Sequence, residues 1–233
     1  MIFPLFFLGC WSLPTEVLLT GQVLEQKDGV GIEGAAIAVH TPLGEPFSEG
    51  SSGADGEFEI GVPASNSFFV TFEAEDHVPT SFTGLAGSED VVADEGTLFL
   101  RSTAELEALR AEFGNCPSAQ DEGPIVEGEV RAWLPVDAEP EELPPVTTAW
   151  ITVYDSQDLT TEACYLDDDG LSLEDGDRTG NTGRFAVFGA PTGPVSIQVS
   201  YDLTDDYSLD YWYIARAPEG GVVPMYPAWV ELP

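Results

Sequence analysis

Five short sequence elements occur twice in this chain, in the same order, and this repeat constrains the fold more than any other feature. The first set lies within residues 21–72 and the second within residues 128–199. The matched pairs are 21–23 (GQV) with 128–130 (GEV), 35–39 (AAIAV) with 149–153 (AWITV), 55–58 (DGEF) with 182–185 (TGRF), 62–63 (VP) with 190–191 (AP), and 68–72 (FFVTF) with 195–199 (VSIQV). Ordered self-similarity of this kind is typical of duplicated structural units, so we predict two copies of one domain.

The matched elements have the pattern of short β-strands and of the turns that precede them. In residues 57–60 (EFEI), Phe58 and Ile60 alternate with two glutamates, which gives one apolar face and one acidic face. Glycine accepts a positive φ without steric cost, so we expect Asp55-Gly56 to form a hairpin turn. Residues 68–72 are also expected to place alternate side chains on one apolar face. Short strands with turn signals every ~8–12 residues predict an all-β sandwich.

One helix is predicted between the two copies. Ser102 followed by Glu105 fits a capping box, which begins a helix. Leu106, Leu109 and Phe113 then keep the spacing of a single apolar face. We expect a short amphipathic helix that either packs on one domain or joins the two.

Four motifs of the first copy follow one another in a recognisable order. They are Gly-x-Val at 21–23, Gly-Ala-x-Ile-x-Val at 34–39, Asp-Gly-x-Phe at 55–58 and Val-Pro at 62–63. This order resembles the carboxypeptidase regulatory-like domain over about residues 17–100 and, more weakly, over about residues 124–233. The resemblance implies a transthyretin-like (prealbumin-like) sandwich of about seven strands, and a non-catalytic module that packs, spaces or binds.

These features predict an all-β chain of two tandem transthyretin-like (prealbumin-like) β-sandwich domains with a short linking helix. A signal peptide, lipobox and tether are expected over residues 1–16 and a first sandwich over 17–100. The helix and a linker would occupy 101–123, and a second, more divergent sandwich with acidic loop insertions would occupy 124–233. Long loops on a rigid sandwich often carry binding, so we expect function in loops that the copies do not share.

The charge of the chain excludes one large class of partner. The formal net charge is −35, from 42 acidic and only 7 basic residues. Such a surface repels phosphate backbones and anionic lipid headgroups, so we predict no nucleic-acid binding and no polybasic membrane contact. A highly soluble exported surface, a saline habitat and a cation-binding surface are all compatible with this charge.

The N-terminus, MIFPLFFLGC, has the features of an exported protein. Residues 2–8 form a short apolar run, far shorter than the ~20 residues of a membrane span. The run ends in Phe7-Leu8-Gly9-Cys10, which resembles the lipobox of bacterial lipoproteins. The resemblance implies that Cys10 is acylated and becomes the first residue of the mature chain. An ordinary signal peptide or a buried first strand are the alternatives.

Two further cysteines, Cys116 and Cys164, remain for the folded part of the chain. In an exported protein they can form a disulfide, which would stabilise the fold by about 4 kcal/mol in the chain-entropy model. Two free thiols, or two small buried apolar side chains, are the alternatives.

The sequence contains no recognisable catalytic set. Its two histidines, His40 and His77, lie in the first copy, and neither belongs to a nucleophile–base pattern. A Gly-x-Ser-x-Gly motif and the full ligand set of a zinc carboxypeptidase are also missing. We therefore predict that the protein is not an enzyme, that it has no catalytic residues, and that calcium is the one candidate cofactor.

One acidic segment, 165–177 (YLDDDGLSLEDGD), has the residue types of a calcium site. It places Asp167 and Asp169 at positions 3 and 5 of an EF-hand loop, but Tyr165 and Gly176 fall where carboxylates are required. Carboxylates can still bind Ca²⁺ in another geometry, and a solvated acidic loop is the alternative. The candidate ligands are Asp167, Asp168, Asp169, Glu174, Asp175 and Asp177.

Aromatic residues near the C-terminus form a second candidate ligand site, a platform of Tyr207, Tyr211, Trp212 and Tyr213. Aromatic rings beside carboxylates suit sugar stacking and hydroxyl recognition. Alternation along a strand would place Trp212 on one face and Tyr211 and Tyr213 on the other, so core packing is the alternative explanation for part of the set.

Together, these observations predict a non-catalytic, exported, lipid-anchored protein that displays its sandwiches at the outer membrane or cell surface. Its partners would be the membrane, through the lipid anchor, and an unknown protein or polysaccharide of the cell envelope. The alternative is a carbohydrate- or Ca²⁺-binding accessory module that serves an envelope enzyme.

Overall fold

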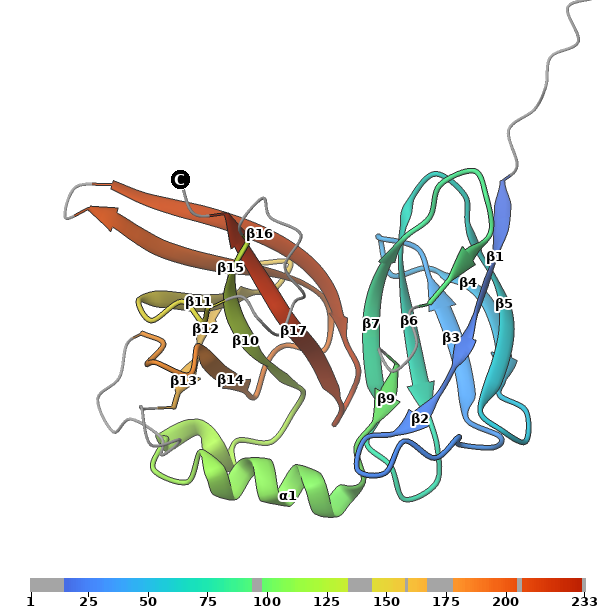
Figure 1. Cartoon of the computed structure of the whole chain (residues 1–233), viewed down its shortest axis with the longest axis horizontal. Helices are drawn as coiled ribbons and strands as arrows, with labels where there is room; N and C mark the ends of the chain where they lie inside the picture. Colours follow the sequence, from blue (N-terminus) through green and yellow to red (C-terminus); the bar gives the residue numbers. More distant parts are fainter. Residues whose placement is uncertain are drawn as a thin grey trace, which may run out of the picture.

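Strands make up most of the described chain and form two bodies, with one helix beneath the second (Figure 1). The computed structural model describes residues 15–93, 98–133, 144–157, 159–166, 178–204 and 207–231. The strands of the first body are β1 (Glu16–Gln22), β2 (Leu24–Glu25), β3 (Ala36–His40), β4 (Pro46–Ser51), β5 (Glu57–Pro63), β6 (Ser67–Glu73), β7 (Thr80–Leu85), β8 (Val91–Val92) and β9 (Phe99–Leu100). Helix α1 (Thr103–Glu112) and the short 3₁₀ helix η1 (Pro117–Gln120) follow. The strands of the second body are β10 (Ile125–Trp133), β11 (Ala149–Tyr154), β12 (Thr160–Glu162), β13 (Cys164–Tyr165), β14 (Arg184–Phe188), β15 (Gly193–Thr204), β16 (Tyr207–Ala217) and β17 (Val222–Glu231).

The two bodies repeat one pattern of strand pairing. β1 pairs antiparallel with β5 and parallel with β8, just as β10 pairs antiparallel with β14 and parallel with β17. The registers agree as well, because Gly21 lies opposite Phe58 and Gly128 lies opposite Phe185. The second sheet of each body has corresponding orders, β4-β3-β6-β7 and β12-β11-β15-β16. The predicted all-β class and the tandem arrangement of sandwiches are confirmed.

Two glycines occupy the same place in the two sandwiches, immediately before β5 and β14. Gly56 and Gly183 have φ of 76° and 68°, a region that favours glycine. Each glycine carbonyl accepts a hydrogen bond of 2.9 Å, from the N–H of Val23 in one copy and of Val130 in the other. A Cβ atom would lie 2.3 Å from the Val23 oxygen at position 56 and 2.6 Å from the Val130 oxygen at position 183. Both φ and the close backbone approach therefore require glycine here.

The prediction of a hairpin at Asp55-Gly56 is wrong, because the strands on either side of the turn do not pair with each other. A turn does form, since the Gly56 N–H donates to the Gly53 carbonyl at 3.0 Å. However, β4 before the turn pairs with β3, and β5 after it pairs with β1. The turn thus carries the chain from one sheet of the sandwich to the other. An Asp-Gly pair sets the local backbone conformation, whereas packing of more distant segments selects the strand partners.

Alternating burial along the strands builds the cores. Phe58 and Ile60 of β5 are buried and the glutamates between them are exposed, as predicted. They belong to a first core drawn from residues between 17 and 100, and a second core is drawn from residues between 126 and 223. The division of the chain at 16/17, 100/101 and 123/124 stays a prediction.

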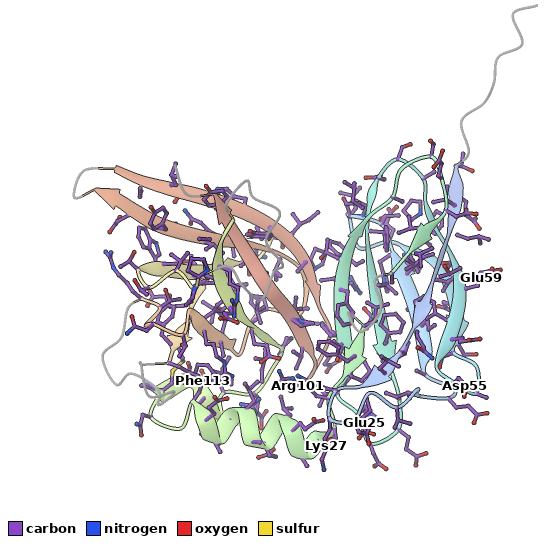
Figure 2. The ribbon with its side chains drawn as sticks, in the orientation of Figure 1. Glu25, Lys27, Asp55, Glu59, Arg101 and Phe113 are labelled. Atoms are coloured by element: carbon purple, nitrogen blue, oxygen red, sulfur yellow. A yellow bond between two sulfur atoms is a disulfide. The ribbon has the colours of Figure 1, made fainter. Side chains whose placement is uncertain are left out.

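Helix α1 begins with the predicted capping box. The Ser102 hydroxyl accepts from the Glu105 N–H at 3.3 Å, and the Glu105 carboxylate accepts from the Ser102 N–H at 2.8 Å. Leu109 and Phe113 are buried against the second sandwich, where Phe113 (labelled in Figure 2) meets the ring of Phe188 edge-on at 5.7 Å. The helix therefore packs on the second sandwich and leads the chain into it.

The two sandwiches share one sheet. β7, at the edge of the first sandwich, pairs parallel with β17 of the second through Thr80 and Val222, and the Val222 N–H donates to the Pro79 carbonyl at 2.7 Å. The result is a continuous eight-stranded sheet in the order β13-β14-β10-β17-β7-β6-β3-β4. The two strands pair at this one position, so each sandwich covers a short part of a strand edge of the other, which is one way in which proteins protect such edges.

The outer face of the sheet formed by β3, β6 and β7 in the first sandwich also contacts strand β16 of the second. His40, Phe69 and Thr83 lie side by side on the outer face of β3, β6 and β7. On this side the Thr83 hydroxyl donates to the Ile214 carbonyl of β16 at 2.8 Å, and Phe69 is only 1% exposed. The strand β6 is therefore buried on both faces, whereas the sequence predicted a single apolar face. Strand alternation alone does not reveal that a second domain covers the outer side.

A buried ion pair lies where the chain leaves the first sandwich. Arg101 follows β9 directly, and its guanidinium lies 2.6 Å from a carboxylate oxygen of Glu127 in β10 (Figure 2). The Glu127 side chain is 1% exposed and that of Arg101 is 14% exposed. Because a charge removed from water is costly unless it is paired, this contact ties the two sandwiches together.

Replacement of Arg101 by Met should lower the free energy of unfolding by about 3–5 kcal/mol, because it leaves a buried carboxylate without its counter-charge. Chemical unfolding in urea measures this loss. The double variant Arg101→Met, Glu127→Gln should recover part of it, since the buried charge is then gone. The control is Asp202→Asn, in a pair with Arg178 whose side chains are 34% and 41% exposed. It should cost less than about 1 kcal/mol. Equal losses for the Arg101 and Asp202 variants would contradict this account.

His40 also lies between the sandwiches. Its Nδ1 atom is buried, and no hydrogen-bond partner for it occurs among the described residues. Burial lowers the pKa of His40, the nearby Arg216 guanidinium of β16 lowers it further, and Glu49 partly opposes this shift. The neutral imidazole is thus the form that suits the folded state.

Stability should therefore fall as the pH drops below the ordinary histidine pKa of about 6.5. The folded protein binds fewer protons at His40 than the unfolded chain does. The stability that neutral His40 contributes is therefore complete above the pKa of the unfolded chain, and it is lost as the pH falls toward the lower pKa of the folded protein. Urea unfolding between pH 7.5 and 5.5 should show a contribution to the slope of at most about 1.4 kcal/mol per pH unit that His40→Gln removes. The same slope in parent and His40→Gln would refute this.

Candidate binding face

The structure divides the aromatic residues predicted near the C-terminus between two faces of β16. Tyr211 and Tyr213 pack against the second core, whereas Trp212 points to the other side and is 58% exposed. The side chain of Tyr207 lies outside the described residues, as do the whole of Cys10 and the candidate calcium ligands between 167 and 177. The four-residue aromatic platform is thus wrong as a single surface, because strand alternation separates its members.

Trp212 instead lies beside residues of neighbouring strands that point to the same side of the sheet. Its ring lies 5.4 Å from that of Tyr154 in β11, and the Tyr154 hydroxyl donates to the Gln198 side-chain oxygen of β15 at 2.6 Å. Strand register places Thr152, Gln198 and Trp212 side by side. We call Trp150, Thr152, Tyr154, Gln198 and Trp212 the outer face of the second sandwich.

A second aromatic group lies along the same face. The Arg178 guanidinium stands 5.1 Å above the centre of the Trp150 ring and forms an ion pair of 2.5 Å with Asp202. On the neighbouring strands the Ser200 hydroxyl donates to the Asp210 carboxylate at 2.6 Å. Aromatic rings on this face therefore alternate with fixed polar groups.

A pocket of about 340 Å³ opens beside Trp150, at the edge between β11 and β12. It forms where β12 ends and the chain crosses to β13 in the opposite sheet. There the Tyr165 hydroxyl accepts the hydrogen bond of the Ile151 N–H at 2.8 Å. The pocket is lined by Trp150, Ile151, Thr152, Glu162, Ala163, Tyr165 and Arg178. Its mixed polar and aromatic lining continues the outer face.

The sequence predicted Trp212 as part of a binding surface and missed Trp150, Tyr154, Gln198 and Arg178. The available signal was the alternation in 149–154 (AWITVY), which puts Trp150, Thr152 and Tyr154 on one side of a strand. Their proximity to Trp212 depends on pairings between β11, β15 and β16, which no local pattern specifies.

Cys116 and Cys164 form a disulfide, with their Cα atoms 6.0 Å apart. The bond joins the segment after α1 to β13, which begins at Cys164. It thereby fixes the helix region to the second sandwich.

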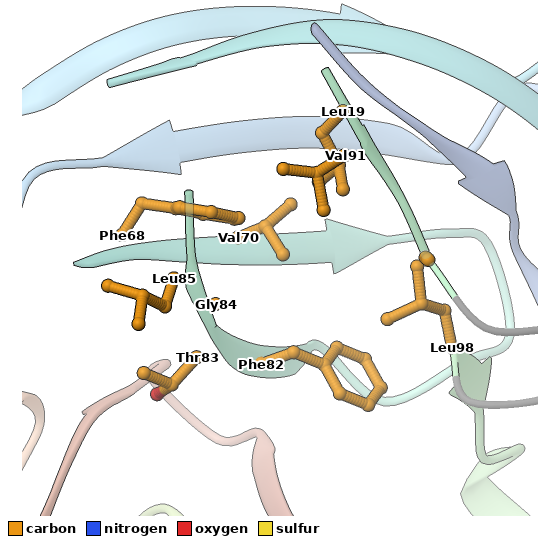
Figure 3. A pocket seen from close by; sticks show the side chains of 10 residues that line it. Leu19, Phe68, Val70, Phe82, Thr83, Gly84, Leu85, Val91 and Leu98 are labelled. Carbon is orange, nitrogen blue, oxygen red and sulfur yellow. The ribbon is translucent and has the colours of Figure 1, made fainter. Parts of the chain in front are cut away.

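A second pocket, of about 220 Å³, lies between the sheets of the first sandwich (Figure 3). Leu19 and Val91 line it from one sheet, and Phe68, Val70 and Phe82 line it from the other. Among the described residues that line it, Thr83 has the one side chain with a polar atom, and its hydroxyl already donates to the Ile214 carbonyl. This described part of the lining therefore offers apolar packing but no group that would orient a polar ligand.

The histidines and acidic residues of the described ranges do not gather into a metal site. No group of three or more His, Cys, Asp or Glu side chains suited to a metal occurs there. His77 bonds through its ring Nδ1 to the Glu75 carbonyl at 2.8 Å, while His40 lies at the contact between the sandwiches. No helix within the described ranges is long and apolar enough to span a membrane.

Comparisons with known proteins give distant structural matches. No protein-family model matches the chain, and no curated protein matches it. The TIE protein of Bacillus anthracis aligns over 93% of this chain and 34% of its own length, with 10% identity and a TM-score of 0.31. This chain thus spans about a third of that protein.

Two pilins give similar values. The shaft pilin SpaA of Lactobacillus rhamnosus GG aligns over 94% of this chain and 99% of its own, with 11% identity and a TM-score of 0.25. BcpA, the major pilin subunit of Bacillus cereus, aligns over 88% of this chain and 69% of its own, with 9% identity and a TM-score of 0.30. Alignments this distant establish no family, and the resemblance to the carboxypeptidase regulatory-like domain stays a prediction.

Proposed function

We propose that the chain is an exported, non-catalytic surface protein in which two interlocked sandwiches act as one rigid arm. Cys10 would carry a lipid anchor at the cell envelope, at the outer membrane or cell surface. The second sandwich would present its outer face to a partner. The buried Arg101–Glu127 contact carries this proposal, because it holds together two domains that a flexible linker would otherwise leave independent.

Several contacts support a rigid arm. The parallel pairing of β7 with β17 continues one sheet through both sandwiches. The Thr83–Ile214 hydrogen bond adds a face contact, and the Cys116–Cys164 disulfide fixes the helical joint. The first two contacts join the sandwiches at a sheet edge and at a sheet face, and the disulfide holds the helical segment on the second sandwich, so rotation of one sandwich against the other would break both the strand pairing and the face contact.

The position of the outer face suits display. The chain enters the first sandwich at β1, whereas β16, the strand that contains Trp212, belongs to the second sandwich (Figure 1). An anchor at residue 10 would therefore hold the first sandwich next to the membrane and leave the second as the presenting domain. The net charge of −35 would keep such an arm soluble and away from anionic headgroups.

A metabolic palmitate label should be incorporated into the full chain expressed in a bacterial host and should be lost from Cys10→Ser. The acylated protein should fractionate with membranes and the variant should not, because a lipid anchor supplies the membrane affinity. The matched control is the double variant Cys116→Ser, Cys164→Ser, which removes two other thiols and should keep the label. Equal labelling of parent and Cys10→Ser would refute lipid anchoring.

A further inference from the structure

We propose that the outer face of the second sandwich binds a neutral polysaccharide, with one sugar ring stacked on Trp212. This inference rests on the proposed display function only in requiring that the face meet partners in solution. It does not require the lipid anchor. Three features of the face support this binding: an exposed ring packed beside a second aromatic ring, polar groups next to it, and the local charge.

Trp212 is exposed and has a second aromatic ring beside it. It is 58% exposed. The Tyr154 ring holds one side at 5.4 Å, and the Tyr154 hydroxyl is itself fixed by donation to Gln198 at 2.6 Å. An aromatic ring fixed before binding loses little conformational entropy when a ligand stacks on it. The apolar faces of sugar rings are suited to such a surface.

Hydrogen-bonding groups lie beside the ring in a line across the sheet. Glu162, Thr152, Gln198 and Trp212 occupy directly opposed positions on β12, β11, β15 and β16. Neighbouring strands are about 4.8 Å apart, so the line extends roughly 14 Å. The Gln198 side-chain oxygen is engaged by Tyr154, and its amide N–H groups have no acceptor among the described residues. The side chains of this line can therefore donate hydrogen bonds to, and accept them from, the hydroxyl groups of a short, extended stretch of a polysaccharide.

The charges on this side favour a neutral sugar over an acidic one. Glu162 and Asp210 are exposed carboxylates near the line. One cation at this face, Arg178, is already paired with Asp202 and stacked on Trp150, and Arg216 lies four residues beyond Trp212 on the same side of β16. An anionic polysaccharide next to Trp212 would meet repulsion from the two carboxylates and find Arg178 engaged. Hydroxyl groups, by contrast, can donate to the same carboxylates.

Affinity electrophoresis of the full chain carrying Cys10→Ser tests the proposal without the anchor. Native gels would contain a neutral glucan, mannan or galactan, or the anionic polymer alginate. At least one neutral polymer should retard the protein and alginate should not. Trp212→Ala should raise the dissociation constant from the retarding polymer about three- to tenfold, through loss of the stacking surface. Retardation by alginate alone, or by no polymer, would overturn the proposal.

Two further variants separate binding from folding. Val92→Ala removes an apolar side chain that is 74% exposed on β8 of the first sandwich and should leave retardation unchanged. Tyr154→Phe keeps the ring but removes its hydrogen bond to Gln198, so it should weaken binding even if Trp212→Ala fails to fold. Unchanged retardation in a folded Trp212→Ala would overturn the assignment to this face. Palmitate labelling reports on the anchor and not on this binding, so failure of one proposal is distinguishable from failure of the other.

Discussion

The contact between Arg101 and Glu127 determines where the second sandwich can lie. A glutamate that is 1% exposed requires a cation beside it, and that cation is supplied by the last residues of the first sandwich. With this point fixed, β17 reaches β7, and the face of β3, β6 and β7 meets β16. The charge pair at the joint, the sheet continuity and the burial of Phe69 thus occur together, and each of them is a contact that joins the two sandwiches.

Features set by neighbouring residues could be predicted from the sequence. The alternation of Phe58 and Ile60, the capping box at Ser102 and the positive φ at Gly56 all follow from local stereochemistry. The duplication was predictable because the same local patterns recur in the same order. The sheet to which each strand belongs was not predictable from these local patterns. For this reason a hairpin was expected at Gly56, where the turn instead connects two sheets.

In the candidate site too, local patterns predicted the direction of a side chain but not its neighbours on other strands. Alternation indicated that Trp212 and Tyr211 face opposite sides of a strand, and the structure agrees. The partners of Trp212 come from 58 and 14 residues earlier in the chain, as Tyr154 and Gln198. Only strand register brings them together, and register is a property of the assembled sheet. The sequence therefore indicates the exposed ring of Trp212 but not the residues that lie beside it.

Corresponding positions in the two sandwiches have different environments. Ala38, Thr71 and Ser81 lie side by side in the first copy, where Thr152, Gln198 and Trp212 lie in the second. Ser81 is 1% exposed and Trp212 is 58% exposed, because the first face lies on the side where the sandwiches meet. Docking of the duplicates thus made two equal surfaces unequal. The covered face is committed to the contact between the sandwiches, and the corresponding face of the second copy stays open to solvent, so the two copies divide the tasks of assembly and exposure inside one chain.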